Sequence, residues 1–132
     1  MPRKPLRVWL AATLPVVAYA ALIVAVSSQS KLPKAPFNDK LMHFGEYAVL
    51  GFLLARAIWL RWDRGLRHAG IFSILAATAF GITDEIHQYF VPNRDADVLD
   101  VVADFAGSLA GSVAWALLAL EVQVRTTRER SI

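Results

Sequence analysis

The first groups in this chain that could perform chemistry are a histidine and two carboxylates near residue 43. Asp39, His43 and Glu46 stand at positions i, i+4 and i+7, a spacing that places all three on one face of an α-helix. Imidazole and carboxylate groups on a common face can ligate a divalent cation or transfer protons. This face is therefore our first candidate for a functional site.

Two later stretches carry polar groups with similar helical spacing. Asp84 and His87 are three residues apart, and so are Glu85 and Gln88. A third helical face carries acidic residues at its start and small residues at its end, namely Asp97, Asp100, Asp104, Gly107 and Gly111. If these stretches are neighbouring helices, their acidic groups converge at one level of a bundle.

Three interpretations of this convergence remain open. The first is a divalent-metal site, because helical bundles build carboxylate metal centres from such spacings. Its candidate ligands are His43, Glu46, Asp84, Glu85 and Asp104. The second is metal-free acid–base chemistry by His43 and Glu85. The third is an ionic network in which Lys40, Arg94 and the histidines neutralise the acids and fix the helix register.

The elements that must position these groups are membrane spans. Of the 132 residues, 56% are hydrophobic and only 19% are charged, whereas soluble domains carry about 25% charged residues. The charges lie in blocks between apolar stretches of about 20 residues, the length of helix that crosses a bilayer. We therefore predict an all-α, four-helix transmembrane bundle that forms one domain over residues 1–132. Its spans are expected at about 8–27, 41–60, 69–90 and 98–120.

Two further features of the sequence concern the first and last spans. The first follows Arg3, Lys4 and Arg7 and so resembles a secretory signal peptide, but its apolar run exceeds the usual core of about 7–15 residues, which favours a retained span. In the last, Gly107 and Gly111 form a G-x-x-x-G spacing that allows close approach of a neighbouring helix, including one from a second copy of the chain. The chain has no cysteine, which excludes disulfides and Cys-based zinc sites.

The basic residues predict the orientation of the spans. Ten of the 14 lysines and arginines flank the N-terminus, the second connection and the C-terminus, and such residues gather on the cytoplasmic side. Both termini are therefore predicted to be cytoplasmic, and the net charge of +3 is a topology signal that gives no support for nucleic-acid binding. Eight of the 11 acidic residues are predicted to lie toward the opposite, outer side of the membrane.

Several of these outer acids are predicted to lie below the membrane surface. At a rise of about 1.5 Å per residue, Glu46, Glu85 and Asp104 sit roughly 7–10 Å inside the outer ends of their helices. A charge at the centre of a spanning helix costs about 2.5–3.5 kcal/mol, and less at shallower depth. These groups should therefore face the bundle interior. We expect Arg94 to be their main counter-charge, and Asp39 and Asp97 to cap the second and fourth helices.

In these motifs the sequence resembles the VanZ-like family of bacterial membrane proteins. The resemblance rests on Asp39-Lys40-Leu41-Met42-His43-Phe44, Tyr47, Leu50-Gly51, the stretch from Thr83 to Arg94 (TDEIHQYFVPNR), Asp97, Asp100, Asp104, Gly107 and Gly111. Two positions depart from the family pattern, because relatives often have glycine in place of Asn93 and Asn in place of Asp104. A turn tolerates Asn at position 93, whereas Asp104 need not be charged to perform its role.

The resemblance implies a multi-pass protein of the bacterial cytoplasmic membrane, and the family's namesake is associated with resistance to teicoplanin-type glycopeptides. Our working hypothesis is an outward-facing site that acts on or binds an envelope lipid or lipid-linked cell-wall precursor, as a hydrolase or transferase if it is an enzyme. The alternative is a non-catalytic protein that modulates an envelope complex or permeates ions. The candidate catalytic residues are His43, Glu46, Asp84, Glu85, His87, Gln88 and Asp100, and the candidate substrate-binding residues are Lys40, Arg94, Asp39, Tyr47 and Asp97.

Overall fold

The protein is a bundle of four helices without strands in the residues that its computed structural model describes, namely 5–30, 39–62 and 65–130. The helices are α1 (Leu6–Ser27), α2 (Asp39–Arg61), α3 (Gly65–Tyr89) and α4 (Val98–Arg130). All four are long and apolar enough to cross a membrane. The prediction of an all-α bundle with four helices able to span a membrane is thereby confirmed.

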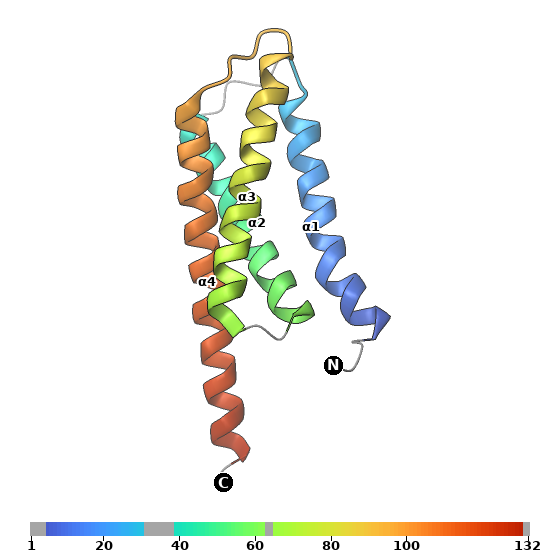
Figure 1. The fold of residues 1–132 in the computed structure, drawn as a ribbon, viewed down its shortest axis with the longest axis vertical. Coiled ribbons are helices and arrows are strands. Elements are labelled where there is room, and N and C mark those ends of the chain that lie inside the picture. The colour runs from blue at the N-terminus through green and yellow to red at the C-terminus, as the bar shows by residue number, and fades with distance from the viewer. Residues whose placement is uncertain (1–4, 31–38, 63–64, 131–132) are drawn as a thin grey trace.

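The fourth helix is longer than a bilayer requires. Its 33 residues correspond to about 50 Å at 1.5 Å per residue, whereas the hydrocarbon core is about 30 Å thick. The helix continues past the predicted span end near 120 as a polar segment that projects from the bundle (Figure 1). In this segment Arg125 Nη2 lies 2.5 Å from Glu121 Oε1 in an i, i+4 ion pair.

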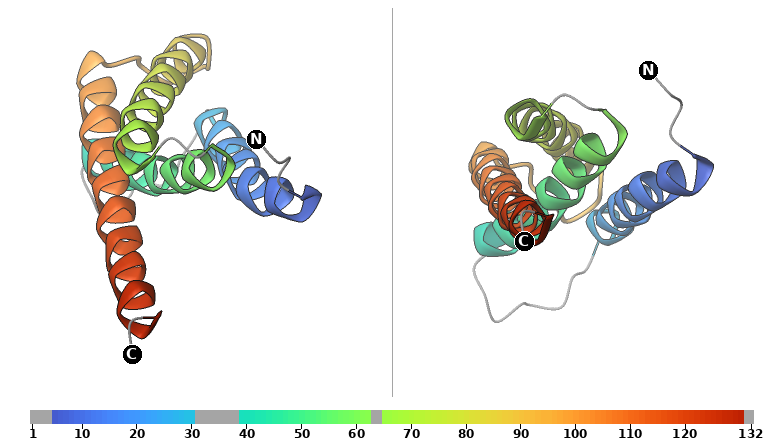
Figure 2. Two further views of the ribbon diagram at one scale, coloured as in Figure 1. Left: turned by 60° about the horizontal axis from the view of Figure 1, so that its bottom comes forward. Right: turned by 90° about the horizontal axis from the view of Figure 1, so that it is seen from below.

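The helices alternate in direction, so the start of α1 and the end of α4 lie at the same end of the bundle (Figure 1). We call this the terminal end, and we call the opposite end, where α2 and α4 begin, the carboxylate end. That the terminal end faces the cytoplasm stays a prediction. Helix α2 is central, because it packs on each of the other three. Within the described residues α1 makes no contact with α4 and few with α3, from which it diverges toward the terminal end (Figure 2).

The closest packing in the bundle is between α2 and α4. A Cβ atom on Gly107 would overlap the carbonyl oxygen of Phe44, and one on Gly111 would overlap that of Ala48. The G-x-x-x-G face predicted from the sequence is therefore buried against α2 of the same chain, and a homo-oligomer through these glycines, which stays a prediction, would have to displace α2.

Large apolar side chains lie mostly on the outside of the bundle. Leu14, Leu75 and Leu117 are exposed, whereas the buried core is built largely from alanine, glycine and serine. This distribution suits a lipid environment, where small residues allow helices to approach and large apolar ones face acyl chains. Ile23, Tyr47, Leu50 and Ala77 form a small buried apolar cluster. It adjoins the polar region at the carboxylate end, because the Tyr47 ring lies beside that of His43.

Candidate functional site

The carboxylate end contains a buried polar network built from α2, α3 and α4. From these three helices, six polar side chains at this end are at most 6% exposed, namely His43, Asp84, Glu85, Gln88, Asp100 and Asp104. Buried polar groups inside a membrane bundle are costly and must be satisfied by one another. The convergence predicted from helical spacing is therefore present, with carboxylates of α3 and α4 meeting His43 of α2.

The centre of this network is His43, held between two acids of different helices. Its Nδ1 lies 3.0 Å from Asp104 Oδ1 on α4, and its Nε2 lies 4.0 Å from Glu85 Oε1 on α3. Asp104 is fully buried and fits because α3 has glycine at position 81, where a Cβ would overlap the carboxylate. A carboxylate on one ring nitrogen fixes the tautomer and orientation of an imidazole, so the Nε2 of His43 is presented to Glu85.

A second chain of contacts runs along α3 through Gln88. The Gln88 amide nitrogen donates to Asp84 Oδ2 at 3.1 Å and to Glu85 Oε1 at 3.4 Å. Its carbonyl oxygen accepts from Arg94 Nε at 3.1 Å and from Arg94 Nη2 at 2.6 Å. Gln88 therefore connects Arg94 to two acids, and Arg94 itself contacts neither.

Lys40 and Asp97 close the network where α4 begins. Lys40 Nζ lies 2.5 Å from Asp97 Oδ2 and 2.8 Å from Asp100 Oδ1. Asp97 caps α4, as predicted, by accepting from the backbone N–H of Leu99 at 2.9 Å, and its own N–H donates to Glu85 Oε2 at 2.9 Å. Lys40, together with the Leu99 N–H, holds the pKa of Asp97 below its ordinary value.

The prediction that Arg94 is the main counter-charge of the acids is wrong. In the described part of the chain the ion pairs at this end are made by Lys40 and His43, and none involves Arg94. The cause is geometric. Arg94 lies in the turn after α3, and from there its guanidinium donates to the side-chain carbonyl oxygen of Gln88. Asn93 in that turn has φ +63°, a left-handed conformation that Asn tolerates and glycine favours.

Not every predicted site residue joins the network. His87 is exposed, and its Nε2 lies 2.9 Å from the Oγ of Ser28, the residue that follows α1. The Tyr47 ring is completely buried beside the imidazole of His43, with ring centroids 6.5 Å apart. Its position behind His43 makes Tyr47 a wall of the site; contact between Tyr47 and a ligand stays a prediction.

A narrow pocket opens at the carboxylate end above His43. Asp39, Glu46 and Arg94 line it together with Asp84 and Gln88. Its volume is about 20 Å³, which is room for about one water molecule or one ion. Glu46 is half-buried there, whereas Asp39 is exposed. The pocket can therefore hold a small polar group of a ligand but not a whole head group.

One group of side chains beside this pocket is close enough together to hold a metal ion. Asp39, His43 and Asp100 each offer a ligand atom, and these atoms lie within 4.8 Å of one another. Among the predicted ligands only His43 belongs to this group within the described residues. Because the Nδ1 of His43 faces Asp104, its Nε2 is the nitrogen available to a cation, and Asp104 would be its outer-shell partner. Metal binding by the other predicted ligands stays a prediction.

The serines at the end of α1 were missed by the sequence analysis. Ser27 Oγ donates to Asp84 Oδ1 at 2.6 Å and is itself buried. The one available signal was that Ser27 and Ser28 end the first apolar stretch, at the same predicted level as the outer acids. Through Ser27, all four helices contribute to the network.

An apolar groove reaches the same network from the side, between α3 and α4. Its apolar lining residues are Ile82, Ile86, Tyr89, Phe90, Val98 and Val101, and its acidic lining residues are Glu85, which is buried, and Asp97. Its volume is about 380 Å³, within the range of small-molecule pockets. Because Ile86, Phe90 and Val98 are exposed on the outside of the bundle, the groove faces the lipid side.

A bundle of four membrane-capable helices with a buried carboxylate–histidine network at one end defines a multi-pass membrane protein. The sequence matches the VanZ/LLP1 family over residues 7–119, and the chain belongs to this family. The resemblance inferred from the motifs is thereby confirmed. No curated protein and no solved structure matches the chain significantly.

Proposed function

We propose that the carboxylate end binds the head group of an envelope lipid or lipid-linked cell-wall precursor and acts on it by acid–base chemistry. The observation that carries this proposal is the lateral groove between α3 and α4, which joins an apolar, lipid-facing wall to Glu85. An amphiphile fits this arrangement, with its hydrocarbon chain in the groove and its polar group at Glu85. A water-soluble substrate would need the pocket above His43, which is too small for it.

The geometry of His43 supports proton transfer at that position. Asp104 fixes the imidazole, and His43 Nε2 and Glu85 Oε1, 4.0 Å apart, are close enough for one oxygen beside the pair to hydrogen-bond to both. Such pairs shift a proton to or from a reacting oxygen. A hydrolase or transferase acting at a head group would use His43 and Glu85 in this way.

Arg94 supports a phosphate-bearing ligand. A guanidinium carries five N–H donors, and Gln88 accepts from two of the nitrogen atoms of Arg94. The remaining donors suit a phosphate oxygen, which arginine binds with charge-assisted hydrogen bonds. In this proposal the membrane is the bacterial cytoplasmic membrane, the carboxylate end faces outward, and a change in cell-wall precursors would link the protein to teicoplanin resistance.

The central test is the isosteric substitution Glu85→Gln, with Asp95→Asn as the matched control, since Asp95 is an exposed acid at the same end. Cells that express each variant are compared by mass spectrometry of phospholipids and lipid-linked precursors, and by teicoplanin susceptibility. We expect the amount of one lipid species to change, relative to cells without the protein, when the wild type or Asp95→Asn is expressed. Glu85→Gln, expressed at the same protein level, should leave that amount unchanged. A lipid change that persists in Glu85→Gln would contradict the proposal.

Elemental analysis of the purified protein distinguishes the two chemical mechanisms. A stoichiometric divalent metal that is lost in His43→Ala and Asp100→Asn but kept in Asp95→Asn would assign the chemistry to a metal at Asp39, His43 and Asp100. Metal-free protein that retains its lipid activity would assign it to the His43 and Glu85 pair.

A further inference from the structure

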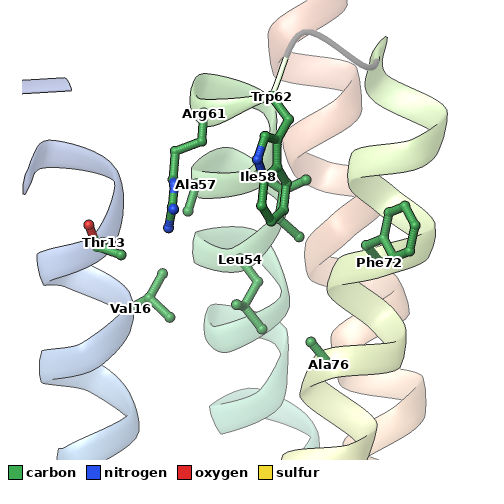
Figure 3. Close-up of a pocket in the computed structure, with 9 residues that line it drawn as sticks. All are labelled: Thr13, Val16, Leu54, Ala57, Ile58, Arg61, Trp62, Phe72 and Ala76. Carbon is green, nitrogen blue, oxygen red and sulfur yellow. The ribbon is translucent and has the colours of Figure 1, made fainter. Parts of the chain in front are cut away.

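The terminal end contains a second groove, far from the carboxylate network. Helix α2 forms its floor, and α1 and α3 form its walls (Figure 3). Its lining is apolar apart from two polar side chains, Thr13 and Arg61, and the other lining residues are Val16, Leu54, Ala57, Ile58, Trp62, Phe72 and Ala76. The volume is about 600 Å³, in the middle of the range for small-molecule sites.

Arg61 places a cation in this groove. Its guanidinium carbon lies 3.6 Å from the centre of the Trp9 ring and 5.4 Å from that of Trp62. Its Nε is buried and has no hydrogen-bond partner among the residues that the structure describes. Arg56, earlier on the same helix, differs, because its Nη1 donates to the carbonyl oxygen of Ala11 at 2.9 Å. The Arg61 cation therefore contacts two aromatic rings, while its Nε–H donor has no hydrogen-bond partner among the described residues.

We propose that this groove is a binding site for an anionic phospholipid. One acyl chain would lie between α1 and α3 on Leu54 and Ile58, and the phosphate would meet the guanidinium of Arg61. The planar guanidinium matches two phosphate oxygens, and a buried N–H donor without a partner favours a ligand that supplies an acceptor.

Position and charge favour a lipid as the occupant. Arg61 ends α2, and tryptophans at span ends mark the level of the lipid head groups. Arg7 and Arg67 are exposed near the same end of the bundle, and clustered basic residues at a membrane surface attract anionic lipids. An uncharged lipid would fill the apolar groove but leave the Arg61 donor unsatisfied.

The test uses the full-length protein in detergent, titrated with phosphatidylglycerol and with diacylglycerol of identical acyl chains, which lacks the phosphate. Native mass spectrometry gives the affinity for each lipid. We expect the wild type to prefer phosphatidylglycerol by about tenfold, the effect of one charge-assisted hydrogen bond. Arg61→Gln should abolish this preference, whereas Arg67→Gln, which removes the same charge from an exposed position, should keep it. Ala76→Phe should fill the groove and weaken the binding of both lipids.

Three results would overturn the proposal: equal affinities in the wild type, an equal loss in Arg67→Gln and Arg61→Gln, or unchanged binding in Ala76→Phe. Circular dichroism establishes that each variant is helical. If Arg61→Gln does not fold, Arg61→Lys decides the question, because it keeps the charge but loses the planar fork. Retention of the full tenfold preference in Arg61→Lys would overturn the assignment of the phosphate to the guanidinium.

Discussion

The two ends of this bundle are held together in different ways. At the carboxylate end, side chains from all four helices are joined by hydrogen bonds and ion pairs across helix boundaries. At the terminal end, α1 diverges from α3 (Figure 2). An apolar groove lies there between the two helices (Figure 3). In lipid, burial of apolar surface gives helices little reason to associate, so polar contacts and small residues decide where they meet. The carboxylate end therefore fixes the bundle, whereas the terminal end is where we propose that a lipid binds.

The largest effect is expected from filling the contact between α2 and α4. In Gly111→Ala the new Cβ would overlap the carbonyl oxygen of Ala48, a backbone atom that cannot rotate away. We expect the free energy of unfolding to fall by about 4 kcal/mol, or folded protein to be lost. The measurement is circular dichroism during titration of mixed micelles with sodium dodecyl sulfate.

Gly45→Ala is the matched control for this substitution, because a Cβ at Gly45 meets no atom within 4 Å. Its unfolding free energy should change by at most about 1 kcal/mol. Equal effects of the two substitutions would show that close backbone contact is not what joins α2 and α4. Because Gly107 packs within the chain as well, Gly107→Leu would damage the fold and cannot by itself reveal an oligomer.

The next largest effect is expected at Asp104. Asp104→Ala leaves His43 buried without its partner, and removal of one member of a buried pair costs about 3 kcal/mol or more. Asp104→Asn retains an oxygen that accepts from His43 Nδ1–H, so we expect a loss of about 1 kcal/mol. The unfolding measurement above distinguishes the two. If Asn is as damaging as Ala, the charge of Asp104, rather than its hydrogen bond, supports the network.

A smaller effect is expected where α1 joins the network. Ser27→Ala removes the donor to Asp84 Oδ1, and loss of this buried hydrogen bond should cost about 1–2 kcal/mol. Ser28→Ala, at an exposed neighbour that contacts His87, should cost below about 0.5 kcal/mol. Hydrogen exchange of α1 amides should accelerate in Ser27→Ala alone. Equal exchange rates in both variants would mean that α1 is anchored elsewhere.

The fold could be predicted because the apolar stretches and the i, i+3, i+4 spacing of the acids are local properties of the sequence. The Asp97 cap and the turn at Asn93 were predictable for the same reason. The partners of Arg94 and His87 were not, because residues three apart on a helix still differ in direction by about 60°. The groove beside Arg61 depends on the divergence of α1 from α3, which no local pattern encodes.

The smallest effect is the pH dependence of the Lys40–Asp97 ion pair, which lies at the outer edge of the network. The Lys40 ammonium and the Leu99 N–H lower the pKa of Asp97 from its ordinary value of 3.8. A carboxyl with a lowered pKa in the folded state contributes stability above its unfolded pKa, and this contribution disappears as the pH falls through the folded pKa. The wild type should therefore melt at a higher temperature than Asp97→Asn at pH 7, and the difference should shrink below about pH 4.

The control for this prediction is Asp95→Asn, whose melting temperature should follow that of the wild type at every pH. Since an exposed ion pair contributes little, the difference at pH 7 should be small and should decrease with added salt. A difference between wild type and Asp97→Asn that stays constant from pH 7 to pH 3 would assign the role of Asp97 to its backbone contacts. In that case the N–H that Asp97 donates to Glu85, rather than its charge, would connect the start of α4 to the network.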